Sequence, residues 1–344
     1  MPTSAEPAIR PPGLAVQAGT VPEAVAAAVA AERSGLASFW SSEFYDRSAA
    51  VTLAAAATAT TRIRLGSAIS WAFGRTPVTM ATDFRSLDEL APGRVSLGLG
   101  PGNPQVIADW HGVDEPHPAP RLAELVRLIR EIWSVRERPV EHDGRFYRCR
   151  LAADPTLSPM SGPLPVLLAG GRPAMLRVAG AVADGLVGLP LCSREFAGEV
   201  VRPALAEGAE QAGRPGPIPV TGMVVCAVLD DAARARAVAA TQVAVFAARR
   251  SAEQLVAFHG FQAEVAAIRE AAERRDVPAM AAAVSDRMLD ALAVYGTPKE
   301  ARERYLENFD GAYDETLLFS SGKGLPPGGF REGTEAICET FAAG

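Results

Sequence analysis

The chain has 344 residues, 48% of them apolar and 22% charged, and its formal net charge is −6. This composition is typical of a globular protein with a sizeable core, and the negative balance argues against a nucleic-acid or an anionic membrane partner. The four cysteines form no CxxC pair and the four histidines no HxxxH pair, which argues against a protein-built metal site and predicts reduced thiols in the cytoplasm. The amino-terminal stretch has no signal-peptide pattern, and charges interrupt every apolar run short of a membrane span.

Short runs rich in β-branched residues and leucine alternate with helical stretches, as in parallel βαβ units. The predicted strands are Gly13–Gln17, Ser38–Ser42, Ile63–Ala68, Val95–Leu99, Val166–Ala169, Gly185–Gly188, Pro219–Val228 and Thr316–Ser320. Strands and helices in this alternation predict an α/β fold, a (β/α)8 TIM barrel with insertions, in one domain over residues 1–344. An open doubly wound sheet is the competing architecture.

Three of the intervening helices have clear boundaries. One has Thr76 as N-cap and Pro77 in its first helical position, and it ends before the next Pro-Gly pair. The stretch Arg121–Trp133 places its apolar residues on one helical stripe. Further along, Thr297 and Glu300 have the spacing of a capping box and predict another helix start.

Two stretches interrupt the alternation of strands and helices. Residues 137–163 predict an insertion that forms a hairpin over the barrel mouth. Residues 230–290 predict two or three alanine-rich helices with no strand between them. Neither stretch has enough large apolar residues for a core of its own, so both are interpreted as insertions in the single domain.

The run from Thr60 to Pro104, TTRIRLGSAISWAFGRTPVTMATDFRSLDELAPGRVSLGLGPGNP, has a strand ending in Gly-Ser, a proline-started helix, an LDEL…GR segment and a second strand ending in GxGxG. The segments GLASFWSSEFYDRSAAVTLAAAATAT, PVLLAGGRPAMLRVAGAVADGLV and YGTPKEARERYLENFDGAYDE stand around it in a consistent order. Together they resemble the luciferase-like oxidoreductases, which include bacterial luciferase, alkanesulfonate monooxygenase, methylenetetrahydromethanopterin reductase and deazaflavin-dependent dehydrogenases. The resemblance covers most of the chain and implies a barrel that carries a flavin or deazaflavin above its strand ends.

The resemblance implies that the cofactor ring lies against the end of the third predicted strand. Gly66, Ser67, Ala68 and Ile69 form the family's bulge there, with a cis peptide bond between Ala68 and Ile69. Gly100 and Gly102 lie in the GLGPG loop, where the family brings its backbone close to the ring or its ribityl chain. Taken alone, this loop also fits a tight turn that requires glycine.

The cofactor phosphate is expected at Gly170, Gly171 and Arg172, which join a strand to a helix N-terminus and so provide a natural anion site. An ordinary strand-to-helix turn is the other interpretation of these residues. The loop Ser320–Gly324 ranks second as a phosphate site, because barrels generally bind phosphate after their last two strands.

Two residues are candidates for proton chemistry. Glu43 closes the second strand where relatives have an acid followed by histidine, but here Phe44 replaces the histidine. Asn103 stands where relatives carry an acid, and an amide can bond a carbonyl but cannot transfer a proton. Glu43 is therefore the candidate acid, with a structural salt bridge as the other interpretation.

Aromatic side chains are expected around the mouth. Trp71 and Tyr45, together with Trp40 and Phe73, are predicted to cluster there, and His111 follows the fourth strand's loop. Trp71, Tyr45 and His111 are the candidates for a substrate pocket, although aromatic residues at strand ends also serve simply as packing.

The function implied by the resemblance is hydride transfer between coenzyme F420 and a small organic substrate held in the mouth under residues 230–290. The fragment from Trp110 to Glu131 resembles the deazaflavin-using branch. The first alternative is an FMN-dependent monooxygenase that receives reduced flavin from a partner reductase. A non-catalytic flavin-binding protein and a sugar-phosphate barrel enzyme are further alternatives, and the sequence leaves a homodimer open.

Overall fold

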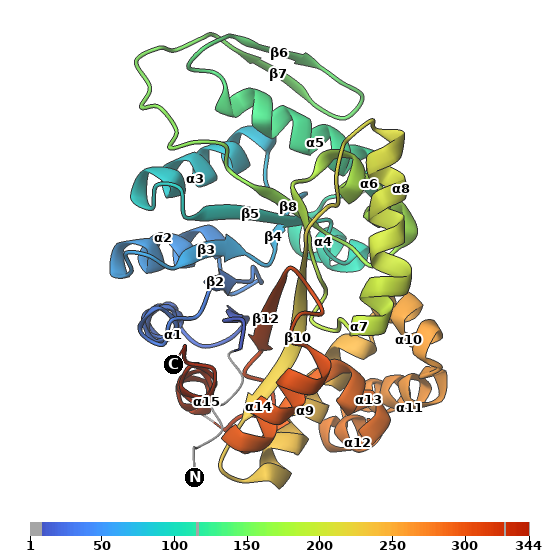
Figure 1. Cartoon of the computed structure of the whole chain (residues 1–344). Helices are drawn as coiled ribbons and strands as arrows, with labels where there is room; N and C mark the ends of the chain where they lie inside the picture. The colour runs from blue at the N-terminus through green and yellow to red at the C-terminus, as the bar shows by residue number, and fades with distance from the viewer. Residues whose placement is uncertain (1–8, 115–116, 327, 344) are drawn as a thin grey trace.

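Eight parallel strands close into a barrel in the computed structural model, which describes residues 9–114, 117–326 and 328–343 (Figure 1). The barrel strands are β1 (Gly13–Val16), β2 (Ser38–Ser41), β3 (Arg64–Ser67), β5 (Val95–Gly100), β8 (Val166–Ala169), β9 (Gly185–Val187), β10 (Val220–Val228) and β12 (Glu315–Ser320). They neighbour one another in chain order, and the β9–β10 and β12–β1 pairings complete the ring. All eight predicted strands and the closed barrel are confirmed.

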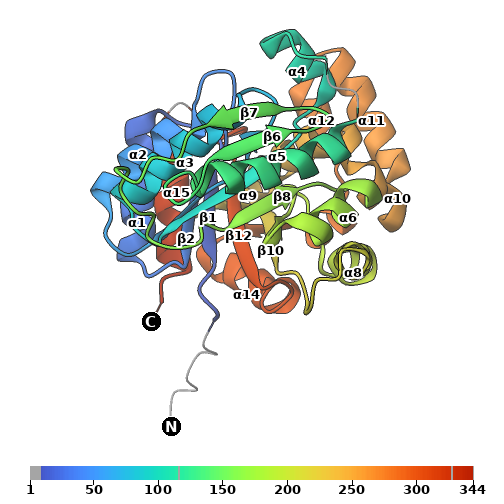
Figure 2. The ribbon, with the colours of Figure 1, turned by 90° about the horizontal axis from the view of Figure 1, so that it is seen from above.

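Helices surround the barrel in the expected alternation (Figure 2). They are α1 (Val21–Arg33), α2 (Ala49–Ala59), α3 (Pro77–Leu90), α4 (Pro104–His111), α5 (Pro118–Trp133), α6 (Pro173–Val182), α7 (Arg194–Phe196) with the π-turn η1 (Ala197–Val201), α8 (Arg202–Gln211), α14 (Pro298–Asn308) and α15 (Gly329–Thr340). Thr76 caps α3, and Thr297 and Glu300 form the capping box of α14, as predicted. Local capping chemistry therefore sets these helix starts.

Two short strands were not predicted from the sequence. β4 (Ser70–Trp71) pairs with the end of β5, and β11 (Ala293–Gly296) pairs with the end of β10 outside the main ring. β10 is long enough to pair with β9 at its start, β12 along its middle and β11 at its end. The extended end of β10 leads into the 230–290 insertion.

Trp40 fills the inside of the barrel. A Cβ atom on Gly66 would collide with its indole ring, and its Nε1 donates to Ser38 Oγ at 2.7 Å. The expectation that Trp40 lies in an aromatic cluster at the mouth was therefore wrong. Because strand residues alternate between the two faces of a sheet, an inward residue near the middle of β2 packs in the core.

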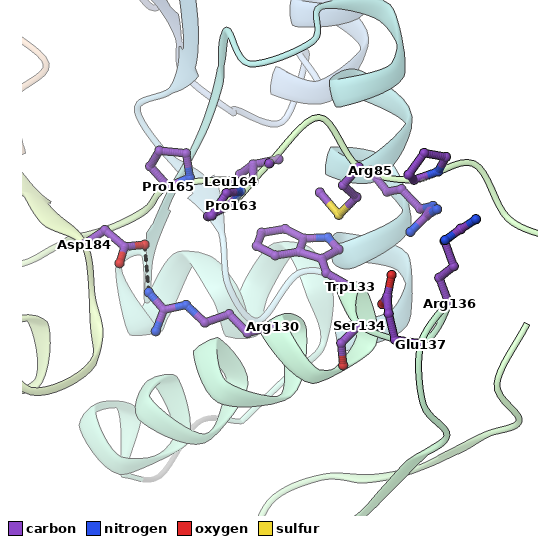
Figure 3. Close-up of a pocket in the computed structure, with 13 residues that line it drawn as sticks. Arg85, Arg130, Trp133, Ser134, Arg136, Glu137, Pro163, Leu164, Pro165 and Asp184 are labelled. Carbon is purple, nitrogen blue, oxygen red and sulfur yellow. Dashed lines mark hydrogen bonds and ion pairs between the residues drawn. The ribbon is translucent and has the colours of Figure 1, made fainter. Parts of the chain in front are cut away.

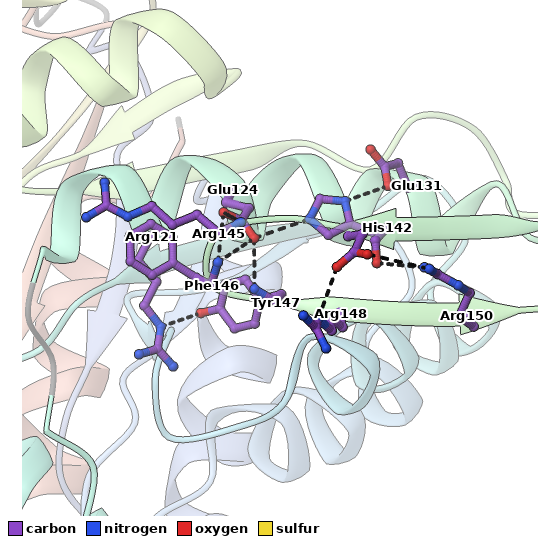
Figure 4. Close-up of polar contacts among 10 residues, drawn as sticks. Arg121, Glu124, Glu131, His142, Arg145, Phe146, Tyr147, Arg148 and Arg150 are labelled. Carbon is purple, nitrogen blue, oxygen red and sulfur yellow. Dashed lines mark hydrogen bonds and ion pairs between the residues drawn. The ribbon is translucent and has the colours of Figure 1, made fainter.

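The hairpin of residues 137–163 exists, but not over the barrel mouth. β6 (Val140–Asp143) and β7 (Arg148–Leu151) lie along the outer side of α5 (Figure 4). Glu124 on α5 accepts three backbone N–H groups of the hairpin tip, those of Arg145, Phe146 and Tyr147. His142 lies between Glu124 (3.3 Å) and Glu131 (3.1 Å), so the hairpin is held to α5 at several points.

The insertion of residues 230–290 contains more helices than the two or three expected. They are α9 (Ala232–Ala247), the 3-10 turn η2 (Arg250–Ala252), α10 (Glu253–His259), α11 (Gln262–Glu273), α12 (Val277–Ala282) and α13 (Asp286–Leu292). Short connecting turns divide this alanine-rich stretch into more and shorter helices than predicted. Figure 1 shows α10 to α13 gathered in one lobe beside the barrel. Gln242 on α9 accepts the N–H of Ser321 at 2.9 Å, which links the insertion to the end of β12.

All four cysteines are free and buried. Among the helices in the described ranges, none has the length and apolarity needed to cross a bilayer.

Candidate active site

The ends of β3, β5 and β8 meet at one point of the barrel mouth. The peptide bond between Ala68 and Ile69 is cis, as the resemblance implied. A Cβ atom on Gly100 would collide with the Ile69 side chain and would lie 3.2 Å from the Ala169 Cβ. Glycine at position 100 therefore allows these three strand ends to approach, and the surface that they form is built from small and apolar groups.

Buried polar atoms without protein partners lie on the other side of the mouth. Gln17 directly follows β1. Because side chains alternate along a strand, it points to the same side as Gly13, where an added Cβ would meet side chains inside the barrel. Its Oε1 is buried and has no hydrogen-bond partner among the described residues. Arg47 donates one Nη to Gly19 O, and its other Nη is buried without a partner in the same part of the structure.

Such orphaned groups are costly unless a ligand or water satisfies them. A flavin or deazaflavin has a flat ring with hydrogen-bonding atoms along one edge, so this mouth fits such a group. The small residues at β3, β5 and β8 suit its face. Gln17 and Arg47 offer an acceptor and a donor for polar atoms.

The predicted phosphate loop joins β8 to α6. Arg172 is the N-cap residue of α6, and its side chain makes no capping hydrogen bond. Pro173 follows it without an N–H, and the Met175 N–H donates to the Arg172 carbonyl at 2.9 Å, which leaves the Ala174 N–H as the donor of this first turn without a capping side chain. A Cβ on Gly171 would lie 3.1 Å from both the Leu189 Cδ1 and the Ser251 carbonyl oxygen. The Gly170–Gly171 turn is thus a closely packed segment at a helix N-terminus, where an anion is favoured.

The second-ranked phosphate loop is less open to an anion. Ser321 donates its N–H to Gln242, and the Lys323 N–H lies 3.4 Å from Ser321 Oγ. A Cβ on Gly322 would lie 2.5 Å from the Ala18 Cβ. Because two of its backbone donors, those of Ser321 and Lys323, are used inside the protein, this loop remains the weaker candidate.

Glu43 lies at the mouth with both carboxylate oxygens engaged. Arg75 Nη1 is 2.5 Å from one oxygen, and the Trp71 N–H donates to the other at 2.8 Å. The Glu43 side chain is 10% exposed, so this ion pair is largely shielded from water. Arg75 also contacts Asp83 at 3.3 Å. Arg75 was not predicted as a site residue, because nothing in the local pattern links it to a strand end 32 residues earlier in the chain.

Asn103 and Gly102 lie at the entry to α4. The Asn103 side chain accepts the Gln105 N–H at 3.0 Å and is the N-cap of this helix. Gly102 has a φ of 73°, a left-handed conformation that favours glycine. The Asn103 side-chain oxygen is therefore used to cap α4.

An aromatic cluster stands at one side of the mouth and differs from the predicted one. Trp71, Tyr45 and His111 belong to it, and Phe44 and Trp110 complete it, with ring centroids 4.7–6.3 Å apart in the contacting pairs. Phe73 does not: it packs against the Arg121 guanidinium at 5.2 Å. Tyr45 is 73% exposed and Trp110 41%, whereas Trp71 is buried. The exposed rings form an apolar surface of the kind that binds ligands or partners.

A cavity of about 480 Å³ lies at the opposite end of the barrel (Figure 3). Its lining includes Pro165, which precedes β8, and Asp184, which precedes β9. Two of its arginines, Arg85 and Arg136, donate to the backbone carbonyls of the adjacent residues 158 and 157. In barrels of this type, catalysis takes place at the carboxyl ends of the strands, and these arginines fasten a loop at the amino-terminal end. We therefore assign the active site to the mouth.

The closed parallel barrel and the strand-end loops define a (β/α)8 enzyme whose mouth fits a flat ring cofactor. Residues 7–315 match the family described as luciferase-like monooxygenase, and the chain belongs to this family of oxidoreductases.

Two relatives show how far the likeness extends. The chain is 30% identical over 285 residues to the 5,10-methylenetetrahydromethanopterin reductase of Methanolobus tindarius, which covers 81% of this chain and 84% of that protein. It is 34% identical over 200 residues to the F420-dependent glucose-6-phosphate dehydrogenase of Kineococcus radiotolerans, covering 54% and 58%.

The fold is also similar to a solved structure. The coenzyme F420-dependent tetrahydromethanopterin reductase of Methanopyrus kandleri superimposes with a TM-score of 0.79 at 23% identity, covering 97% of this chain and 98% of that one. This likeness supports the barrel fold assigned above.

Proposed function

We propose that this chain is a coenzyme F420-dependent oxidoreductase that transfers a hydride between the deazaflavin and a small organic substrate, acting as a single domain. The observation that carries the proposal is similarity to a relative whose name states F420 dependence, at 34% identity over more than half of the chain. The mouth geometry agrees with a planar ring cofactor, because small groups at Gly100 and Ala169 leave a flat surface beside Ile69. When bound, F420 supplies a two-electron hydride carrier.

In this proposal the cofactor is held by the residues at three strand ends. Gly66, Ser67, Ala68 and Ile69 form the support for one face of the ring, and Gly100 and Gly102 allow close backbone approach. Gly170, Gly171 and Arg172 hold the phosphate at the N-terminus of α6, where backbone N–H groups and the helix dipole favour an anion.

The substrate lies beside the aromatic cluster. The exposed rings of Tyr45 and Trp110 and the buried Trp71 provide an apolar wall that excludes water, with His111 at its edge. Glu43 is the group that exchanges a proton with the substrate, and Arg75 stabilises its charge at 2.5 Å. Asn103 has no such role, since its side chain caps α4.

The runner-up is an FMN-dependent monooxygenase supplied with reduced flavin by a partner reductase. It shares the ring-binding strand ends, so the mouth alone does not separate the two cofactors. The third candidate, a flavin-binding protein without turnover, is favoured by the absence of a histidine after Glu43 and by the capping role of Asn103.

Absorbance titrations of the purified protein with F420 and with FMN test the proposal. We expect a dissociation constant for F420 at least tenfold lower than that for FMN, followed by reduction of bound F420 by a member of a panel of alcohols and aldehydes. Tighter binding of FMN would support the monooxygenase. Binding of F420 with no turnover across the panel, in either direction, would support the non-catalytic protein.

A further inference from the structure

Four arginines belong to segments near the Gly170–Gly171 turn. Arg172 caps α6, Arg249 and Arg250 lie at the start of η2, and Arg269 lies on α11. Three of them surround Glu253, the first residue of α10: its carboxylate is 3.6 Å from Arg172, 3.8 Å from Arg250 and 3.7 Å from Arg269. We call these three residues, Arg172, Arg250 and Arg269, the arginine cluster.

The arginine cluster has more positive charge than its surroundings neutralise. Among the described residues, Glu253 is the only acidic side chain within ion-pair distance of Arg172, Arg250 and Arg269. One carboxylate faces three guanidinium groups, and all three distances exceed 3.5 Å. Ion pairs this long are weak, and neighbouring like charges repel, so the arrangement favours a further anion.

Arg249 precedes Arg250 in the chain and has no acidic partner among the described residues. Its guanidinium lies over the Phe246 ring at 4.5 Å, and desolvation by burial lowers the pKa of Arg249. A half-buried arginine that makes a cation–π contact but no ion pair is available to bind an anion.

The arginine cluster lies directly beside the proposed phosphate site. A Cβ on Gly171 would lie 3.1 Å from the Ser251 carbonyl oxygen, so η2 packs directly on the phosphate loop. A chain of negative groups that continues from a phosphate at Gly170 and Gly171 would therefore meet Arg172 and then the residues around Glu253.

We propose that the arginine cluster binds the anionic tail of F420, beyond its phosphate. This rests on the proposed function. F420 continues from its phosphate through a lactyl group into a chain of glutamates, each of which adds a carboxylate, whereas FMN ends at the phosphate. Arg172 meets the phosphodiester, and Arg250 and Arg269 bind the carboxylates in place of Glu253. The cluster thereby selects the deazaflavin cofactor.

Fluorescence titrations with three probes test this proposal: the deazaflavin alcohol without phosphate, the lactyl phosphodiester without glutamates, and F420 with a long glutamate tail. At low salt we expect the long-tailed cofactor to bind at least tenfold more tightly than the tail-less phosphodiester. High salt should abolish this difference, because screening weakens exposed charge pairs. Equal affinities of the two phosphorylated probes at low salt would overturn the tail proposal while leaving the proposed function intact. If neither binds, both fail.

Variants locate the effect. Arg250→Ala, at a side chain that is 83% exposed, should weaken long-tail binding about two- to fivefold and leave the tail-less probe unchanged. Combining it with Arg269→Ala should give a larger loss of long-tail affinity.

Glu253→Gln removes the competing carboxylate and should strengthen long-tail binding, an outcome that a misfolded variant cannot produce. Arg177→Ala, on α6 and paired with Glu207 at 3.4 Å, is the matched control and should have no effect. Loss of affinity in the control but not in Arg250→Ala would contradict the assignment.

Discussion

The two ends of the barrel differ in whether buried polar atoms are left without partners. At the amino-terminal end, carboxylates close the strand starts: Glu32 accepts the N–H groups of residues 61–63, Asp184 that of Val166 and Asp314 that of Val220. At the carboxyl end, Gln17 and Arg47 have buried atoms without partners in the part of the chain that the structure describes. Saturated polar groups stabilise the fold, whereas unsatisfied ones are available to a ligand.

This contrast predicts that substitutions at the amino-terminal end change stability, and that those at the carboxyl end change binding or turnover.

Asp184→Ala should lower the free energy of unfolding by about 2–3 kcal/mol, because it leaves the buried N–H of Val166 unpaired and removes the ion pair with Arg130 at 2.7 Å. Urea denaturation measures the loss, and cofactor affinity should not change. Asp184→Asn keeps an acceptor for Val166 and should cost less. A loss of cofactor affinity in a folded Asp184→Ala variant would break the separation between the two ends.

Glu32→Gln should reduce stability at neutral pH by about 2 kcal/mol, after allowance for solvent screening. Burial raises the pKa of Glu32, but the backbone N–H groups of Ile63, Arg62 and Thr61 outweigh it and lower the pKa from 4.5 to about 2. A lowered folded-state pKa contributes stability that is complete above about pH 4.5 and is lost as the pH falls towards 2. Unfolding measured against pH should therefore show a flatter acid slope in the variant. An unchanged slope would mean that Glu32 is not the group responsible.

Gly171→Asp should weaken cofactor binding by more than tenfold, about 1.4 kcal/mol, because it places a negative charge at the proposed phosphate site. Gly171→Ala adds the same Cβ, with its contacts at 3.1 Å, without the charge, and separates steric from electrostatic effects. Titration of both variants with cofactor gives the comparison. Similar affinities of the two would place the phosphate elsewhere, with the Lys323 loop as the next candidate.

Glu43→Gln should lower kcat at least tenfold and leave the cofactor dissociation constant within a few-fold, since only the charge and the proton-transfer capacity are removed. The amide oxygen of the substituted side chain can still accept the Trp71 N–H, so the loop should hold its position. The pH profile of kcat distinguishes proton transfer from a structural role, because loss of the acid should remove one of its limbs. An unchanged profile would make Glu43 the structural partner of Arg75.

Gln17→Leu should give the smallest effect, a change of about 1 kcal/mol. The change should have opposite signs for the stability of the cofactor-free protein and for cofactor affinity. Stability without cofactor should stay the same or rise, because a buried acceptor without a partner is removed. Cofactor affinity should fall. Gln211→Leu, at an exposed glutamine on α8, is the control and should change neither. A marked loss of stability in Gln17→Leu would show that its side chain is satisfied in the cofactor-free protein.

The sequence by itself determined the barrel and its helices. Strand runs of β-branched residues, the N-cap at Thr76 and the capping box at Thr297 and Glu300 act over a few neighbouring residues, so their patterns can be read directly. The order of the strand-end loops was also readable and led to the family. The same order located the cis bond between Ala68 and Ile69.

Only the tertiary structure decided which distant groups meet. Glu43 pairs with Arg75, which is not a neighbour in sequence, and the hairpin at 137–163 lies against α5 because Glu124 can accept its tip N–H groups. β11 is a short segment after a helix, and it is a strand because its backbone pairs with the end of β10. The arginine cluster around Glu253 joins three helices. In each case the deciding interaction is between segments far apart in the chain, and local periodicity contains no information about such pairs.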